Sequence, residues 1–270
     1  MSDKTVPEAA LDRATSARAF LGLLQRDSWN TLRHELGGFL AQSLLQPLAF
    51  LFVFGRVLPN IGAAGEGYAQ QLLPGIIALT LMLTALQNVA LPLVIEFSYT
   101  KEVEDRLLAP LSPAMVALEK VVFSTGRAIV AAVLILPLGE WILPHGLQTH
   151  GAHWWLFILL LIFGGFAGAA IGLVLGTLVP PNRINIVFAV ALTPLIFTGA
   201  TFYPWQLLDS LRWFQVITLF NPLTYVSEGM RGALTGMPHL GAWWIVLGMA
   251  VSTIAFFIIG VRGFIYRAVD

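Results

Sequence analysis

The sequence predicts an all-α integral membrane protein with six transmembrane helices, an N-terminal amphipathic interfacial helix, and short outer helices between spans five and six. The chain has 270 residues, of which 57% are hydrophobic and 11% charged, and its mean hydropathy is +0.79. An ordinary soluble chain carries roughly 25% charged residues. The sequence also contains several nearly charge-free runs of the length, about 20 residues, that a helix needs to cross a bilayer. These runs are too long and too uniformly apolar for barrel strands.

The six predicted spans belong to one membrane domain, residues 36–266. A cytoplasmic segment, 1–35, precedes this domain and a short cytoplasmic tail, 267–270, follows it. The third span is interrupted by Arg127 and Glu140, whereas the others are nearly free of charge. The spans cover residues 36–55, 67–95, 121–142, 154–182, 184–208 and 243–261.

Residues 17–35 form the predicted interfacial helix. The first 35 residues carry charges throughout and lack the compact apolar core and small-residue cleavage site of a signal peptide. Apolar residues alternate with charged ones, and Trp29 adds an interfacial anchor. The alternative is a solvated helix. In this pattern Phe20, Leu23, Leu24 and Leu32 alternate with Arg18, Arg26, Asp27 and Arg33.

The distribution of basic residues predicts that both termini are cytoplasmic. With the N-terminus inside, eleven Lys and Arg residues fall in cytoplasmic segments, and three fall outside: Arg56, Arg212 and Arg231. Cytoplasmic loops of membrane proteins carry such an excess of positive charge. Seven of the eight tryptophans then lie near the outer interface. We therefore expect a multi-pass protein of the cell (plasma or inner) membrane.

The sequence also excludes several kinds of chemistry. A formal net charge of zero excludes a basic nucleic-acid binder, and the absence of cysteine excludes disulfides and thiolate sites. The three lysines, Lys4, Lys101 and Lys120, do not follow glycines, so the chain has no Gly-x-x-x-x-Gly-Lys-[Ser/Thr] phosphate loop. We predict no catalytic residue and no cofactor in this chain.

Three histidines in the loop between spans three and four raise the question of a metal site. His-x-x-His spacing can bind a metal. No acid or cysteine completes a set of ligands around His145, His150 and His153. We therefore interpret this loop as solvated and predict no metal site.

The predicted inner loop, residues 96–113, concentrates five charges within residues 101–106 and follows them with an apolar Leu pair and two prolines. Charged residues of both signs, followed by two leucines and then by prolines that end a helix, are compatible with a short helix that contacts a soluble partner. The alternative is a solvated loop that merely maintains the topology.

Two segments of the chain resemble a known family. Glu-Val-Glu-Asp-Arg-Leu-Leu-Ala-Pro-Leu-Ser-Pro, residues 102–113, is similar to the inner loop of ABC-2 type transporter permeases. Asn-Pro-Leu-Thr-Tyr-Val-Ser-Glu-Gly-Met-Arg-Gly-Ala-Leu, residues 221–234, is similar to the second signature of that family. The order of surface helix, spans and loops also matches, so the resemblance covers nearly the whole chain.

The resemblance implies a function that composition does not show. Such permeases act as dimers, here expected to be a homodimer, and pair with two copies of a separate ATP-binding subunit that carries the ATP and Mg. They export drugs, glycolipids or polysaccharides on lipid carriers. The surface helix and the inner loop dock onto the ATPase, which assigns ATPase coupling to Lys101, Glu102, Glu104, Asp105, Arg106, Leu107, Leu108 and Pro110.

The alternative function is a secondary transporter or a non-transporting membrane scaffold. An ion-driven carrier usually shows buried ionisable groups in its spans, and here the spans offer Arg127 and Glu140.

The outer segment, residues 203–242, is apolar but broken by prolines, which predicts two short helices. Its signature residues are Asn221, Pro222, Tyr225, Glu228 and Arg231. Glu228 with Arg231, and Asp209 with Arg212, are three residues apart and can pair along a helix. The segment forms either an outer gate on the export path or a structural cap.

Three features inside the spans have two readings each. Arg127 either reaches the inner headgroups or pairs with Glu96, or it acts as a latch between the inner loop and the spans. Gln42 and Gln46 either bond to a neighbouring helix or face a lateral path between protomers. Four glycines at four-residue spacing allow another helix to approach closely, from this chain or from a second copy. They are Gly164, Gly168, Gly172 and Gly176.

Overall fold

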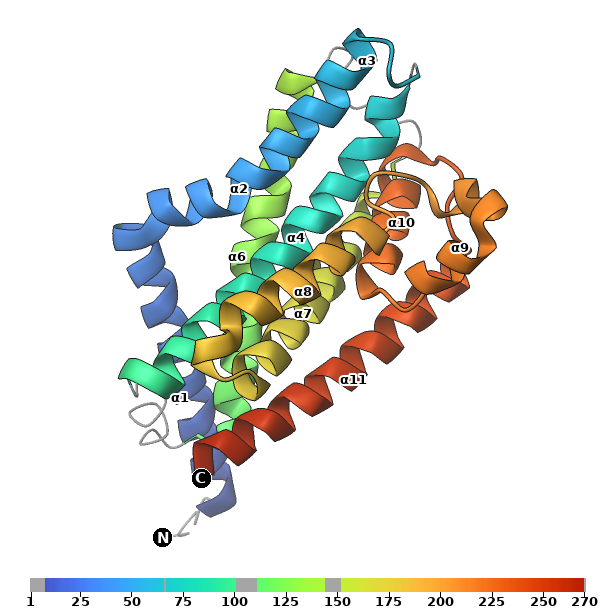
Figure 1. Cartoon of the computed structure of the whole chain (residues 1–270). Coiled ribbons are helices and arrows are strands. Elements are labelled where there is room, and N and C mark those ends of the chain that lie inside the picture. The colour runs from blue at the N-terminus through green and yellow to red at the C-terminus, as the bar shows by residue number, and fades with distance from the viewer. Residues whose placement is uncertain (1–7, 66, 101–110, 144–151, 270) are drawn as a thin grey trace, which may run out of the picture.

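The protein is a bundle of long helices (Figure 1). The computed structural model describes residues 8–65, 67–100, 111–143 and 152–269, and within these ranges all regular structure is helical. In the same ranges six helical segments are long and apolar enough to cross a membrane. The predicted all-α integral membrane fold is thereby confirmed.

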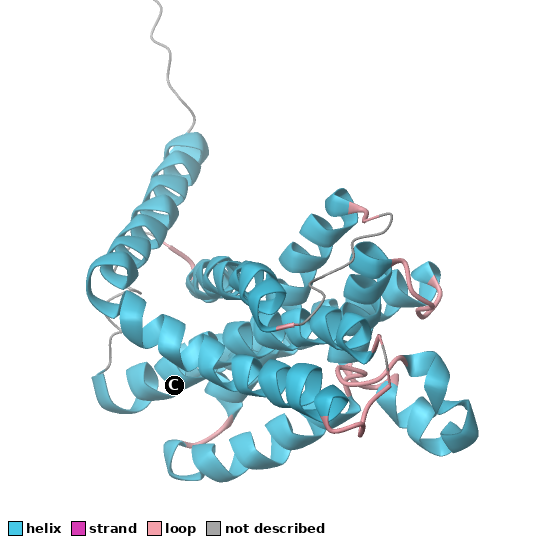
Figure 2. Ribbon diagram, turned by 90° about the horizontal axis from the view of Figure 1, so that it is seen from above, coloured by secondary structure: helices cyan, strands magenta, loops and turns pink. Residues whose placement is uncertain are grey.

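The N-terminal segment is a continuous helix with a bend. Helix α1 (Glu8–Asn30) passes through the π-helical turn η1 (Thr31–Glu35) into α2 (Leu36–Phe52), and η2 (Val53–Val57) and α3 (Leu58–Asn60) complete the first span. The start of α1 extends beyond the rest of the bundle (Figure 2), whereas its later part packs against α6 (Pro113–Ile142) before the chain turns into α2. The bend lies at the predicted boundary between surface helix and first span.

Helix α4 (Tyr68–Ile95) is the centre of the bundle, and the π-helical turn η3 (Glu96–Thr100) continues it. Every side chain from Leu72 to Leu86 is buried. A helix that is apolar on all sides is stable where other helices surround it. Helices α2, α6, α7 and α10 pack around α4.

Helix α6 (Pro113–Ile142) begins eight residues before the predicted third span. Ser112 caps it by accepting a hydrogen bond from the backbone N–H of Met115, and Pro113 occupies the first turn, where a missing N–H costs nothing. Arg127 is therefore fourteen residues inside the helix, about 21 Å along its axis, rather than six residues inside it as the predicted boundary at 121 gives.

Helix α7 (Trp154–Leu178) packs its glycines against the backbone of α4. A methyl group on Gly168 would lie 2.5 Å from the carbonyl oxygen of Met82, and one on Gly172 would lie 2.4 Å from that of Leu86. Gly164 faces Leu81 of α4 and Val226, and Gly176 faces Ala90 and Leu93. The helix that approaches the four glycines thus belongs to the same chain. Helix α7 ends before Pro180 and Pro181, four residues earlier than predicted.

The fifth span is shorter than predicted. After the short turn η4 (Pro181–Arg183), α8 (Ile184–Thr198) ends ten residues before the predicted boundary at 208. The apolar residues beyond it turn back into the protein: Ala200 and Thr201 are fully buried, and the Thr201 carbonyl lies so close to Gly75 of α4 that a methyl group there would be 2.0 Å away. Irregular backbone is tolerated at membrane depth where protein covers it.

Two short helices and one buried helix precede the last span. The prolines of this segment predict the two short helices. They are η5 (Trp205–Leu211), α9 (Arg212–Thr218) and α10 (Pro222–Thr235), followed by α11 (Ala242–Val269). The start of α1 and the end of α11 lie at the same end of the bundle, called here the termini end (Figure 1). The opposite, far end carries the exposed side chains of Trp141, Trp154, Trp155, Trp213, Trp243 and Trp244.

We predict that Gly172→Ala lowers the unfolding temperature in detergent, because the added methyl would overlap the α4 backbone and overpacking costs about 1–3 kcal/mol. Gly126→Ala in α6 is the matched control: nothing lies within 4 Å of its methyl position, so that variant should be neutral or slightly stabilising. Equal unfolding temperatures for the two variants would show that the α4–α7 contact is looser than described.

Candidate functional site

Two polar clusters lie at opposite ends of α4. The first, at the far end, is a buried ion pair between Glu228 and Arg231 on α10. Both side chains are fully buried, and their spacing of three residues places them on one face of the helix. The predicted Glu228–Arg231 pair is therefore formed.

The protein satisfies this ion pair with hydrogen bonds from several elements. The Arg231 guanidinium donates to the carbonyl oxygen of Ala200 (3.0 Å) and, at 3.3 and 3.4 Å, to that of Gln71 near the start of α4. The Glu228 carboxylate accepts from the backbone N–H groups of Trp205 (3.0 Å) and Leu240 (2.8 Å). Burial lowers the pKa of Arg231, and the Glu228 carboxylate opposes that shift. The pair thus ties α10 to α4, to the segment after α8 and to the approach to α11.

The other signature residues brace the same region. Asn221 caps α10 by accepting from the Leu223 N–H, and its side-chain amide donates to the Leu195 carbonyl oxygen (2.8 Å) and the Thr198 hydroxyl (2.9 Å) at the end of α8. Pro222 occupies the first turn of α10.

Tyr225 joins α10 to the last span. Its hydroxyl donates to the Leu219 carbonyl oxygen (2.6 Å), and its ring lies directly against Gly248 of α11. Burial raises the pKa of Tyr225 above its ordinary value.

The predicted Asp209–Arg212 pair does not form among the described side chains. The Asp209 carboxylate instead accepts a hydrogen bond from the Gln215 side chain (3.0 Å). Asp209 lies in the 3₁₀ turn η5 and Arg212 opens α9, so the two do not share one regular α-helix, which the predicted spacing requires.

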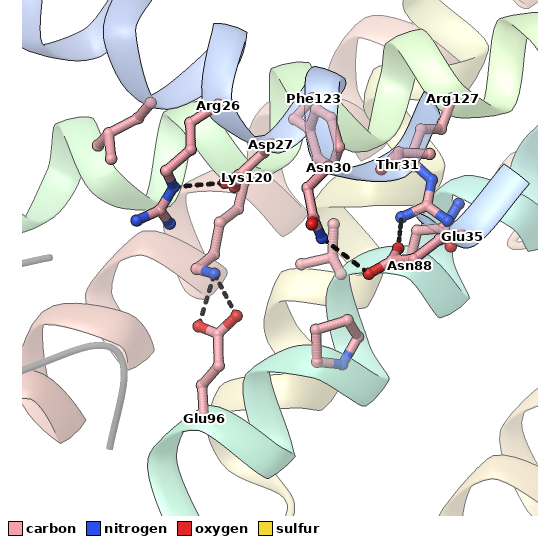
Figure 3. Close-up of a pocket in the computed structure, with 13 residues that line it drawn as sticks. Arg26, Asp27, Asn30, Thr31, Glu35, Asn88, Glu96, Lys120, Phe123 and Arg127 are labelled. Atoms are coloured by element: carbon pink, nitrogen blue, oxygen red, sulfur yellow. Dashed lines mark hydrogen bonds and ion pairs between the residues drawn. The ribbon is translucent and has the colours of Figure 1, made fainter. Parts of the chain in front are cut away.

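The second cluster lines a cavity of about 690 Å³ toward the termini end, between α1, α4 and α6 (Figure 3). Each helix contributes one face, at the three- and four-residue spacing that brings side chains to the same side. The lining residues are Leu23, Arg26, Asp27, Asn30, Thr31, Glu35, Asn88, Val89, Pro92, Glu96, Lys120, Phe123 and Arg127.

A tight ion pair joins the two helices that flank the predicted inner loop. The ammonium group of Lys120 on α6 lies 2.6 and 2.7 Å from the two carboxylate oxygens of Glu96, at the end of α4. Both side chains are about nine-tenths buried. Lys120, not Arg127, is therefore the partner of Glu96.

Arg127 binds the bend between α1 and α2. Its guanidinium lies 3.7 Å from the Glu35 carboxylate and 4.4 Å from the ring centroid of Phe39 on α2. Glu35 also accepts a hydrogen bond from Asn30 (3.1 Å) at the end of α1. The expectation that Arg127 pairs with Glu96 is wrong, because the bend brings Glu35 back to α6 and supplies a carboxylate at the depth of Arg127.

The predicted coupling residues themselves, Lys101 to Pro110, lie outside the described residues, as do His145 and His150. His153 precedes α7, where its backbone N–H donates to the Ala233 carbonyl oxygen (2.8 Å). Across the described part of the chain, no three His, Cys, Asp or Glu side chains gather as metal ligands would.

Among the charged residues of this cavity, Lys120 and Glu35 are the two to which the sequence assigned no role. Glu96 and Lys120 are each twelve residues from Leu108 in the sequence. If the two spans form a hairpin whose turn is centred on Leu108, these two residues face each other, so sequence spacing could have predicted their pairing. No comparable signal exists for Glu35, since its position depends on the angle of the bend.

Comparison with known proteins gives one family and several relatives. The model of the family described as ABC-2 type transporter matches residues 18–235. The inner membrane transport permease YadH of Escherichia coli K12 is 24% identical over 239 residues, which cover 86% of this chain and 90% of that protein. The putative transport permease ycf38 of Cyanophora paradoxa is 28% identical over 204 residues, 71% of this chain and 66% of its own length.

We predict that Glu228→Gln destabilises the protein by about 3–5 kcal/mol, because it leaves the buried Arg231 charge without a counter-charge. The control is Glu140→Gln, since Glu140 is exposed near the end of α6 and should change stability little. Unfolding in detergent, followed by intrinsic fluorescence, measures both. A Glu228→Gln variant as stable as the control would contradict the role given to this pair.

Proposed function

The chain belongs to the ABC-2 type transporter family, and from that premise we propose that it is the membrane subunit of an ATP-driven exporter whose ATPase is a separate subunit. Membership and the names of its relatives make it a transport permease. The absence of a phosphate loop supports a partner chain as the place of ATP hydrolysis. The chain itself carries out no covalent chemistry in this proposal.

One observation supports the coupling route most directly: the cavity connects the two elements that dock onto the ATPase in the family. Glu35···Arg127 joins the end of α1 to α6, and Lys120···Glu96 joins α6 to α4 across the loop 96–113. A movement of either docking element therefore reaches both spans through charged contacts rather than through apolar surfaces that slide easily.

In the proposed cycle, ATP draws two ATP-binding subunits together, and the surface helix and the inner loop transmit this movement to the spans. Helix α4 then carries it to the far end, where the Gln71 carbonyl accepts from Arg231. The α10 network would shift with α4 and open a route outward, so the segment 203–242 serves as an outer gate in this account.

We place both termini in the cytoplasm, because the segments on that side carry the excess of basic residues. We place the protein in an inner membrane by analogy with YadH, whose name states that location.

The surfaces of α2 and α8 support a dimer. On α2, Gln42 and Gln46 are exposed and make no hydrogen bond with other described residues. On α8, whose residues are all described, Ile196 alone has a buried side chain, so little of this helix is enclosed by the rest of the protomer. Polar side chains of a span usually face protein or a water-filled path rather than lipid. We therefore place a second copy of the permease across this face, with the two glutamines on a lateral path for an amphiphilic substrate such as a drug, a lipid or a lipid-linked glycan.

The charge reversal Glu104→Lys with Arg106→Glu should abolish ATP-dependent export, because it inverts the charges that meet the ATP-binding subunit. Two measurements check this: co-purification of the ATP-binding subunit, and transport by the reconstituted complex. Glu140→Lys, which reverses one exposed charge near the end of α6 away from the loop, is the control and should leave both unchanged. Export at the wild-type rate by the double variant would reject the loop as the coupling element.

A further inference from the structure

The cavity between α1, α4 and α6 has a property that coupling does not require: one of its ion pairs, Arg127–Glu35, is open enough to admit further polar groups. We propose that it binds the headgroup of a membrane phospholipid that carries both a phosphate and a primary ammonium group. This site does not depend on the proposed exporter mechanism.

The first support is the position of the cavity relative to lipid. On the side of α1 away from the cavity, Leu21, Trp29 and Leu32 are 63%, 54% and 60% exposed. The Arg33 guanidinium lies 4.1 Å from the centroid of the Trp29 ring. An exposed apolar stripe with an aromatic residue and a basic residue beside it is typical of a helix in the interface, with its apolar face among the lipids. The cavity on the opposite face of the same helix therefore lies at the depth of the headgroups.

The second support is the difference between the ion pairs. Lys120 and Glu96 are in direct contact at 2.6 Å, so their charges already neutralise one another. Arg127 and Glu35 are 3.7 Å apart, beyond the 2.7–2.9 Å of a charge-assisted hydrogen bond, and the Arg127 Nε donor has no acceptor. Glu35 is half exposed, so its carboxylate has room for a second donor. A phosphate beside Arg127 would accept a hydrogen bond from its guanidinium, and an ammonium group beside Glu35 would donate one to its carboxylate.

The balance of charge selects the class of headgroup. The cavity is lined by three basic and three acidic side chains, so a purely anionic headgroup would meet carboxylates as well as cations (Figure 3). A choline headgroup has no N–H to donate to Glu35. An ethanolamine headgroup has both a phosphate and an N–H donor, and the cavity volume of about 690 Å³ lies within the ~300–1,000 Å³ usual for small-molecule sites. Its apolar lining, which includes Leu23, Pro92 and Phe123, offers contacts for the lipid stem.

The test is lipid retention by the full-length permease. The protein is incubated with equimolar phosphatidylethanolamine, phosphatidylcholine and phosphatidylglycerol, and the bound lipid is measured by native mass spectrometry. We expect about tenfold more phosphatidylethanolamine than either other lipid, the factor that one charge-assisted hydrogen bond supplies. Glu35→Gln should remove the preference, because it removes the carboxylate that accepts from the ammonium group. Arg127→Met should lower the retention of all three lipids, because each carries a phosphate. Arg183→Met, which removes an exposed charge on η4, should leave both the retention and the preference unchanged.

Equal retention of the three lipids by the wild-type protein would overturn the proposal, and so would an unchanged preference in Glu35→Gln. Since Glu35→Gln is nearly isosteric and partly exposed, its unfolding temperature should match that of the wild type, which separates loss of binding from loss of fold. Soluble glycerophosphoethanolamine distinguishes the source of the headgroup. If it raised the unfolding temperature as much as the lipid does, the ligand would be a soluble one and the lipid assignment would be wrong.

Discussion

The close contact between α4 and α7 is the constraint on which the rest of the structure depends. Transmembrane helices gain little from the hydrophobic effect in lipid, so they associate through close packing, which small residues permit. Gly168 and Gly172 bring α7 onto the backbone of α4 with no room for a methyl group. Because α4 is also enclosed by α2, α6 and α10, it cannot shift without moving its neighbours. The long, rigid helix that results joins the two polar clusters.

These clusters have different physical characters. At the far end, Glu228 and Arg231 are fully buried and completed by backbone groups, so they fix α10 in one position relative to α4. At the termini end, the lining of the cavity includes the close pair Lys120–Glu96 and the more open pair Arg127–Glu35. In the proposed cycle, the termini end receives the movement of the ATP-binding subunit and the far end transmits it to α10. The open Arg127–Glu35 pair is also where the proposed lipid headgroup would bind, next to the bend between α1 and α2.

The sequence predicts the number and order of the spans because each coincides with a long apolar run. It fails where apolar residues pack against protein rather than lipid. Residues 199–208 continue the hydrophobic run of the fifth span, yet Ala200 and Thr201 are buried within the protein, Thr201 against Gly75 of α4. Composition does not distinguish burial in protein from exposure to lipid. The Glu228–Arg231 pair follows from helical spacing alone. The partner of Arg127 does not, because Glu35 reaches it through the geometry of the η1 bend, which no local pattern specifies.

The most direct test of the central claim is the location of the loop 96–113 in the working complex. The chain has no cysteine, so Glu104→Cys provides a single reactive position. The account predicts that a membrane-impermeant maleimide labels this cysteine from the cytoplasmic side only, and that a short bifunctional reagent crosslinks it to the ATP-binding subunit. Labelling from the external side, or free labelling with no crosslink to any ATP-binding subunit in an actively transporting complex, would contradict it.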